Sequence, residues 1–232
     1  MEEKPSARRL RPFRGELALA ITVVIDSFSV VLMLYSGSGI SGISAISSVP
    51  YAFSVSLPFF TLGTWTYLFQ AALVITLMVL RRRFVPAYLF SFVVGFVFGE
   101  LLDVFELFIG LLPTALALRV VYFVVSYLLI CVGIALSNRC GLPIIPTDLF
   151  PRDLAAITGW PYPRVKIGFD AGCLVVTVGM TLFFMGRVMG IGMGTVLAAL
   201  TMGKVIGLVG QWLDRHFTFT TPRLFRRRTR AS

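Results

Sequence analysis

Six apolar segments, each about 20 residues long, make up most of this chain, and few ionisable residues interrupt them. A helix of that length can cross the hydrocarbon core of a bilayer, where it satisfies its own backbone hydrogen bonds. Apolar residues are 57% of the 232 residues and charged residues only 14%, which is too few to cover a soluble domain of this size. The sequence therefore predicts an all-α, polytopic membrane protein.

The distribution of basic residues predicts how the chain crosses the membrane. The predicted spans are Leu17–Ser36, Thr64–Leu80, Pro86–Phe105, Arg119–Leu136, Ile167–Met185 and Val188–Leu208. They form one membrane domain, residues 17–214, between two basic tails at 1–16 and 215–232. Eighteen Lys and Arg residues fall on the side of the tails, against Arg119 and Arg187 on the other side. Basic residues concentrate on the cytoplasmic side, so we expect both termini in the cytoplasm. Lipid headgroups, rather than nucleic acid, then account for the net charge of +10.

The order of spans and linkers repeats within the chain. Residues 17–107 and 117–214 each contain a span, a linker broken by Gly and Pro, a second span, a short turn and a third span. The linkers are Gly37–Gly63 and Gly141–Pro163. Because each half has an odd number of spans, the halves would have opposite orientations, and such inverted repeats are typical of secondary transporters. Six helices with accidental symmetry are the alternative.

Three short motifs carry a resemblance to a known family. The linkers contain GSGISGISAISSVPYAFS and CGLPIIPTDLF, and the last span reads IGMGTVLAALTMGKVIGLV. Over residues 17–214 the chain resembles the YczE/YyaS/YitT group of bacterial integral membrane proteins, although Pro86–Tyr88 replaces the Gly-rich entry to the third span expected in that group. The resemblance implies a transporter-like protein of the bacterial inner membrane and implies no catalytic residues.

Ionisable and amide side chains within the spans are the candidate site residues. A charge near the bilayer centre costs about 2.5–3.5 kcal/mol even on insertion scales, so it is seldom there without a partner or a function. Asp26 lies at the middle of the first span. It is either a carboxylate that handles a proton, a cation or a cationic substrate, or a structural group that ties two helices together. Gln70 is a candidate lining residue of the second span.

Glu100 and Lys204 occupy matching positions in the two halves and carry opposite charges. Helical side chains tilt toward the N-terminus of their helix, so both would lean toward the midplane and meet there, as a functional pair or as a structural ion pair. Asp103, one turn after Glu100, would extend an acidic face toward the outside. Asp170 is expected to pair with Lys166, four residues earlier.

The linkers are candidate binding segments because they combine helix-starting residues with Gly and Pro. We expect short helices to begin at Ser47 or Ser48, before Val49 and Pro50, and at Thr147 or Asp148. Their N-termini would point into the membrane toward an anionic group of a ligand. The alternative is that both linkers lie at the membrane surface, and the charged residues after Thr147 favour this for the second.

These residues leave three classes of function open. The first is a small-molecule or ion transporter with alternating access, the second a substrate-binding subunit of a modular importer, and the third a non-transporting scaffold. An enzyme is not expected, because no nucleophile–base pair is apparent. No cofactor and no metal are expected, since the three cysteines and His216 lack ligand spacing. Glycines four residues apart, such as Gly95/Gly99 and Gly168/Gly172, favour close helix packing within the chain or in a homodimer.

Overall fold

The computed structural model describes residues 11–37, 45–186 and 193–220. Eight helices and two short strands follow one another in these ranges. In chain order they are β1 (Arg11–Arg14), α1 (Gly15–Tyr35), α2 (Ala45–Ser56), α3 (Leu62–Arg81), α4 (Pro86–Ile109), α5 (Leu116–Ser137), α6 (Pro146–Thr158), α7 (Tyr162–Met185), α8 (Met193–His216) and β2 (Phe217–Thr220).

The helices confirm an all-α membrane protein but not all six predicted spans. Four helices are long and apolar enough to cross a membrane by length and composition, namely α1, α3, α5 and the part of α7 from Arg164. Two further predicted spans fall on α4 and α8, which are 24 residues long but are not among those four. α4 carries three acidic residues near its end. The start of the predicted sixth span, Val188, lies outside the described residues.

Local sequence explains where several helices begin and end. Pro86 and Pro146 are the first residues of α4 and α6, where a missing N–H is tolerated and the fixed φ suits a helix. Gly159 and Gly186 follow the last residues of α6 and α7 with φ of 71° and 65°, a left-handed conformation that glycine adopts without strain. Both helices therefore end in a left-handed turn at a glycine.

The short helices exist, but their starts differ from the prediction. α6 begins at Pro146, within two residues of the predicted start, whereas α2 begins at Ala45. Ser48 is therefore inside α2 and does not cap it, and the side chain of Ser47 lies outside the described residues. Pro50 and Pro151 lie inside the two helices rather than in their first turns. Each proline removes one backbone hydrogen bond, which a short helix packed on neighbours tolerates.

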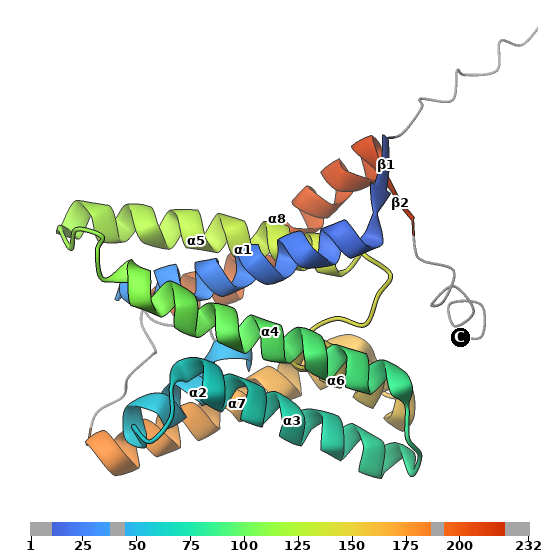
Figure 1. Cartoon of the computed structure of the whole chain (residues 1–232), viewed down its shortest axis with the longest axis horizontal. Helices are drawn as coiled ribbons and strands as arrows, with labels where there is room; N and C mark the ends of the chain where they lie inside the picture. The colour runs from blue at the N-terminus through green and yellow to red at the C-terminus, as the bar shows by residue number, and fades with distance from the viewer. Residues whose placement is uncertain (1–10, 38–44, 187–192, 221–232) are drawn as a thin grey trace, which may run out of the picture.

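Helix α4 runs through the middle of the molecule (Figure 1). It packs against α1 on one side and α3 on the other. α1 also packs along α5, while α2, α3, α6 and α7 form the opposite layer. β1 pairs in parallel with β2, and Phe13 lies opposite Phe219, so that the two ends of the described chain lie side by side.

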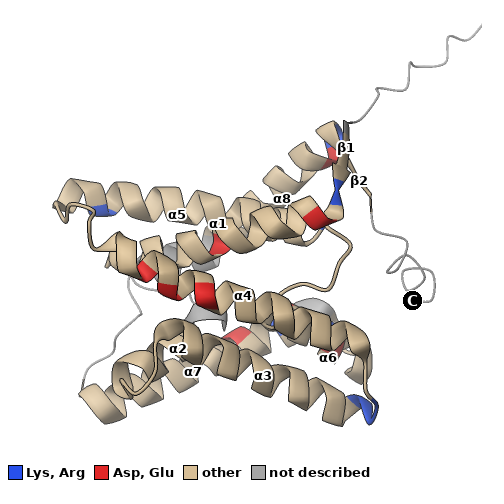
Figure 2. Cartoon of the chain, viewed as in Figure 1, with Lys and Arg blue, Asp and Glu red and all other residues tan. Residues whose placement is uncertain are grey.

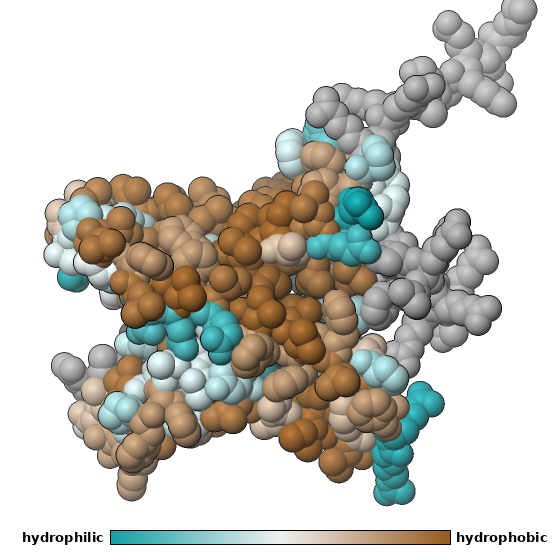
Figure 3. Space-filling view, in the orientation of Figure 1, coloured by the Kyte–Doolittle hydropathy of each residue, from teal (hydrophilic) through white to brown (hydrophobic). Residues whose placement is uncertain are grey.

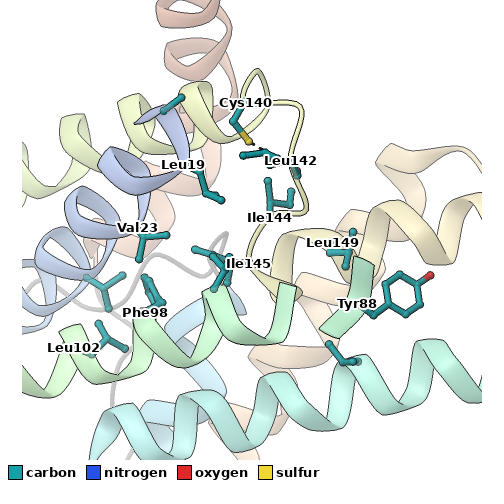
Figure 4. Packing of buried hydrophobic residues seen from close by; sticks show 14 of the residues in the cluster. Leu19, Val23, Tyr88, Phe98, Leu102, Cys140, Leu142, Ile144, Ile145 and Leu149 are labelled. Atoms are coloured by element: carbon teal, nitrogen blue, oxygen red, sulfur yellow. Dashed lines mark hydrogen bonds between the residues drawn. The ribbon is translucent and has the colours of Figure 1, made fainter. Parts of the chain in front are cut away.

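The largest buried cluster of apolar side chains joins α1, α4 and the segment before α6. Figure 4 shows Val23 of α1 and Phe98 of α4 close to Ile145, the residue that precedes α6. All three side chains are at least nine-tenths buried. This packing brings the first turn of α6 toward the middle of α1, where Asp26 follows Val23 by almost one helical turn.

The outer surface is mostly apolar on the face shown in Figure 3. Exposed large apolar side chains occur on every long helix, for example Val79 on α3, Leu107 on α4 and Val175 on α7. A continuous apolar surface of this kind marks a membrane contact rather than a water-facing surface. A hydrophilic patch interrupts it, and Figure 2 shows acidic residues along that part of α4.

Candidate functional site

Buried polar atoms with no hydrogen-bond partner in the described part of the chain occur on seven side chains: Asp26, Ser48, Ser56, Gln70, Arg81, Ser137 and Thr147. We call four of them the central polar cluster: Asp26 on α1, Ser48 on α2, Gln70 on α3 and Thr147 on α6. α2, α3 and α6 pack on one another, so three of the four come from mutually packed helices. An unsatisfied buried polar group costs about 1–3 kcal/mol, and four of them in one domain call for an explanation.

Asp26 lies in the contact between α1 and α5. Its carboxyl group fills the space next to Gly133, where any side chain would overlap it. Thr22, one turn earlier on the same face, donates a hydrogen bond to the Gly133 carbonyl at 3.3 Å. The residue is only 3% exposed, and Oδ1 has no partner among the described residues. Asp148, in the first turn of α6, lies within electrostatic reach of Asp26.

Gln70 lies in the contact between α3 and α4 and is fully buried. Its side-chain oxygen fills the space next to Gly95, and Pro146 at the start of α6 borders the same space. Neither Oε1 nor Nε2 has a hydrogen-bond partner in the described residues. One side chain thus offers a free acceptor and a free donor next to the first turn of α6.

The first turn of α6 contributes Thr147 and Asp148. Thr147 is 1% exposed and its hydroxyl has no partner in the described chain. Burial raises the pKa of Asp148, and the positive charges of Lys166 and Arg152 partly offset this effect. Lys166 itself forms an ion pair of 2.9 Å with Asp170, as the spacing of four residues predicted. Asp170 is therefore compensated, unlike Asp26.

The predicted pair of Glu100 and Lys204 is wrong. Both side chains are exposed, and no ion pair joins them in the described residues. Their helices do not pack extensively on each other, because α1 and α5 lie between them: α4 packs on α1, α1 on α5, and α5 on α8. The two positions match in sequence layout, but their helices pack on different neighbours.

Asp103 has a local structural role at the start of α3. It accepts hydrogen bonds from the Thr61 hydroxyl at 2.5 Å and from the Gly63 backbone N–H at 2.7 Å. A carboxylate suits this position, because it satisfies donors at a helix N-terminus and opposes the positive end of the helix dipole. Glu106, one turn further along α4, is exposed.

A second polar cluster, which the sequence did not reveal, joins α3, α4 and α6. We call Arg81, Tyr88 and Asp153 the inner cluster. Arg81 Nη2 lies 3.3 Å from Asp153 Oδ2, and the Tyr88 hydroxyl donates to the same carboxylate oxygen. The Arg81 guanidinium also lies over the Tyr88 ring, 5.7 Å from its centre. Nearby, the Ser91 hydroxyl donates to the Ile144 carbonyl. Asp153 and Ile144 lie far in the sequence from the residues they contact, so no spacing pattern predicts these contacts.

These features define an α-helical membrane protein in which polar groups are buried among apolar helices. No group of three His, Cys, Asp or Glu side chains in the described ranges is arranged to hold a metal ion. Residues 13–211 match the model of the family of unknown function DUF6198, and the chain belongs to that family. No curated protein matches the chain. No solved structure matches it either.

Proposed function

We propose that this protein is a membrane transporter for a small polar solute and that the central polar cluster is its binding site. The observation that carries the proposal is the set of free hydrogen-bonding groups on Asp26, Ser48, Gln70 and Thr147. Ligand sites are mostly apolar and contain a few convergent polar groups that fix orientation. A bound solute would satisfy these groups, whereas a scaffold gains nothing from burying them.

We further propose six spans arranged as two inverted repeats. In this arrangement α1, α2, α3 and α4 of the first half correspond to α5, α6, α7 and α8 of the second half. Three pairs of packed helices then have a packed counterpart: α1–α4 corresponds to α5–α8, α2–α3 to α6–α7, and α2–α7 to α6–α3. The pairs α3–α4 and α4–α6 have no such counterpart, since neither α7 nor α2 packs extensively on α8 in the described residues. The exchange of the three pairs named above supports a repeat.

The two short helices support the same repeat. Each of them contains an internal proline, Pro50 in α2 and Pro151 in α6. Broken segments at matching places in two halves are the usual location of the substrate site in transporters. Transport would proceed by alternating access, with the two halves moving around the central polar cluster.

The inner cluster is suited to closing the cytoplasmic side. With both termini in the cytoplasm, Arg81 and Pro86 lie at the inner ends of α3 and α4, and Asp153 fastens α6 to them. Breaking these contacts would let α6 move away from α3 and α4. A bacterial inner membrane as the location and the likeness to the YczE/YyaS/YitT group are part of this proposal, as is the absence of enzymatic activity.

Reconstitution of the purified protein alone in liposomes tests the proposal. Light scattering after mixing with ethanolamine, urea or glycerol would report entry of each solute. We expect the protein to move at least one of them and the Gln70→Leu variant to move none. Thr76→Val is the matched control: Thr76 is an exposed residue of α3 whose hydroxyl bonds only within its own helix, and transport should persist.

Two outcomes would replace the proposal with an alternative. Solute binding without entry would favour a binding subunit that needs an energising partner. If the protein keeps its helical content and monodispersity but neither binds nor admits a solute, a scaffold would be favoured.

A further inference from the structure

We infer that the solute is a small organic cation with a hydroxyl group, held by Asp26 at its ammonium end. This inference rests on the proposed function, because it concerns the same central polar cluster. It narrows the solute from any polar molecule to one chemical class. It is argued from the charges around Asp26, from the free acceptors and from the free donors of the described residues.

The first step is the charge around Asp26. Its carboxyl group is 3% exposed and takes part in no ion pair in the described chain. The charged group within its reach is another acid, Asp148. Lys166 is held by Asp170 at 2.9 Å, and Arg152 is exposed. A buried carboxylate is seldom tolerated without a positive partner, and here a bound cation would supply one.

The second step is the inventory of free acceptors. Asp26 Oδ1 and Gln70 Oε1 both lack a donor in the described residues. These two side-chain oxygens come from α1 and α3. The Thr147 carbonyl of α6 lacks its usual helical donor, because Pro151, four residues later, has no N–H. An ammonium group has three N–H donors and no acceptor, which suits such a set of oxygens.

The free donors specify the rest of the solute. Gln70 Nε2 and the hydroxyls of Ser48 and Thr147 have no acceptor in the described chain. They require an oxygen on the solute in addition to its charged end. A hydroxylated ammonium ion of a few atoms meets both requirements, whereas a carboxylate would be repelled by Asp26 and Asp148.

Three probes of similar size separate charge from shape: ethanolammonium, ethylene glycol and glycolate, each with at least one hydroxyl. The experiment titrates each probe into the detergent-purified full chain at constant ionic strength and follows the midpoint of thermal unfolding. Because the probes have few atoms, their affinity is limited and the titration runs through the millimolar range. We expect ethanolammonium to raise the midpoint and the other two to leave it unchanged.

Two variants locate the effect. Asp26→Asn keeps the size of the side chain and removes its charge, and it should weaken ethanolammonium binding about tenfold or more. Glu16→Gln makes the same chemical change at an exposed residue of the same helix and should bind like the unmodified protein. An equal response to glycolate or ethylene glycol in the unmodified protein, or no response to ethanolammonium, would overturn the inference whether or not Asp26→Asn folds.

The same probes distinguish this inference from the proposed function. If ethanolammonium binds through Asp26 but does not enter proteoliposomes, the cation site stands and the transport proposal fails. If glycolate enters and ethanolammonium does not, transport stands and the cation site fails. Unweakened ethanolammonium binding by Asp26→Asn would leave Asp26 as a structural, protonated group and would also overturn the inference.

Discussion

The carboxyl group of Asp26 in α1 occupies the space above Gly133 in α5, so that a side chain at position 133 would overlap both carboxyl oxygens. Gln70 fills the space above Gly95 in the same way. In both places a glycine of one helix makes room for a buried polar side chain of its neighbour. The glycines therefore shape the central polar cluster as much as its polar residues do.

The contact between Asp26 and Gly133 predicts a specific clash. Gly133→Ala should destabilise the protein by about 1–3 kcal/mol, the usual effect of overpacking a filled site. Gly179→Ala is the control, because Gly179 of α7 has open space around it and alanine favours a helix. Thermal unfolding in detergent measures both. Adding Asp26→Ala should relieve the clash, and a Gly133→Ala variant as stable as the unmodified protein would contradict this packing.

The free amide of Gln70 predicts a conflict between stability and function. Gln70→Leu replaces two unpartnered polar atoms with an apolar group of similar size, so it should raise the unfolding free energy by about 1 kcal/mol while it abolishes solute entry. Denaturant unfolding and the liposome assay measure the two effects. A destabilised Gln70→Leu variant would mean that the amide has a structural partner, such as a bound water.

The inner cluster predicts a coupled pair. Asp153→Ala leaves the largely buried Arg81 guanidinium without its carboxylate, and we expect a loss of about 1–3 kcal/mol in the unfolding free energy. Arg83→Gln, which removes an exposed basic residue two positions later, should change stability little. The double variant Arg81→Met, Asp153→Leu should be more stable than Asp153→Ala. If the stability changes of Arg81→Met alone and Asp153→Leu alone add up to that of the double variant, the two residues do not interact.

The ion pair between Arg139 and Asp214 predicts a small response to acid. The Arg139 guanidinium donates two hydrogen bonds of 2.7 Å to Asp214, beyond the membrane segments, and lowers the pKa of that carboxyl. The pair therefore stabilises the fold above the unfolded pKa of Asp214, and this contribution is lost as pH falls through the folded pKa. The pair is exposed, so the effect should be below about 1 kcal/mol. Asp214→Asn should remove that part of the acid response; an unchanged response would exclude the pair as its source.

The pairing of β1 with β2 bears on topology, because it holds both ends of the described chain together. Reporters fused before Met1 and after Ser232 should therefore give the same answer. The excess of basic residues on that side predicts that both report a cytoplasmic location. Opposite answers would require an odd number of spans, and a periplasmic signal from both would reverse the orientation.

The sequence by itself determined the features that depend on neighbouring residues. Hydropathy identified the long helices, and the third predicted span begins at Pro86, as α4 does. The ion pair of Lys166 and Asp170 follows from a spacing of four residues, because one helical turn brings such side chains together. Asp26 and Gln70 were identifiable as candidates because polar groups are rare in apolar spans. These signals depend only on nearby residues, so they are the same however the helices pack.

Only the tertiary structure decided which helices touch and which faces they present. It separated Glu100 from Lys204 by placing α1 and α5 between their helices. It also put Gln70 beside Gly95, Asp103 at the start of α3, and Arg81 against Asp153. Gly168 and Gly172, whose spacing predicted close packing, have open space where a Cβ would lie, as far as the described residues show. The reason is physical: hydropathy records that a helix is buried in lipid or protein, but rotation about its axis and the choice of its neighbours are set by the fit of side chains contributed by distant segments.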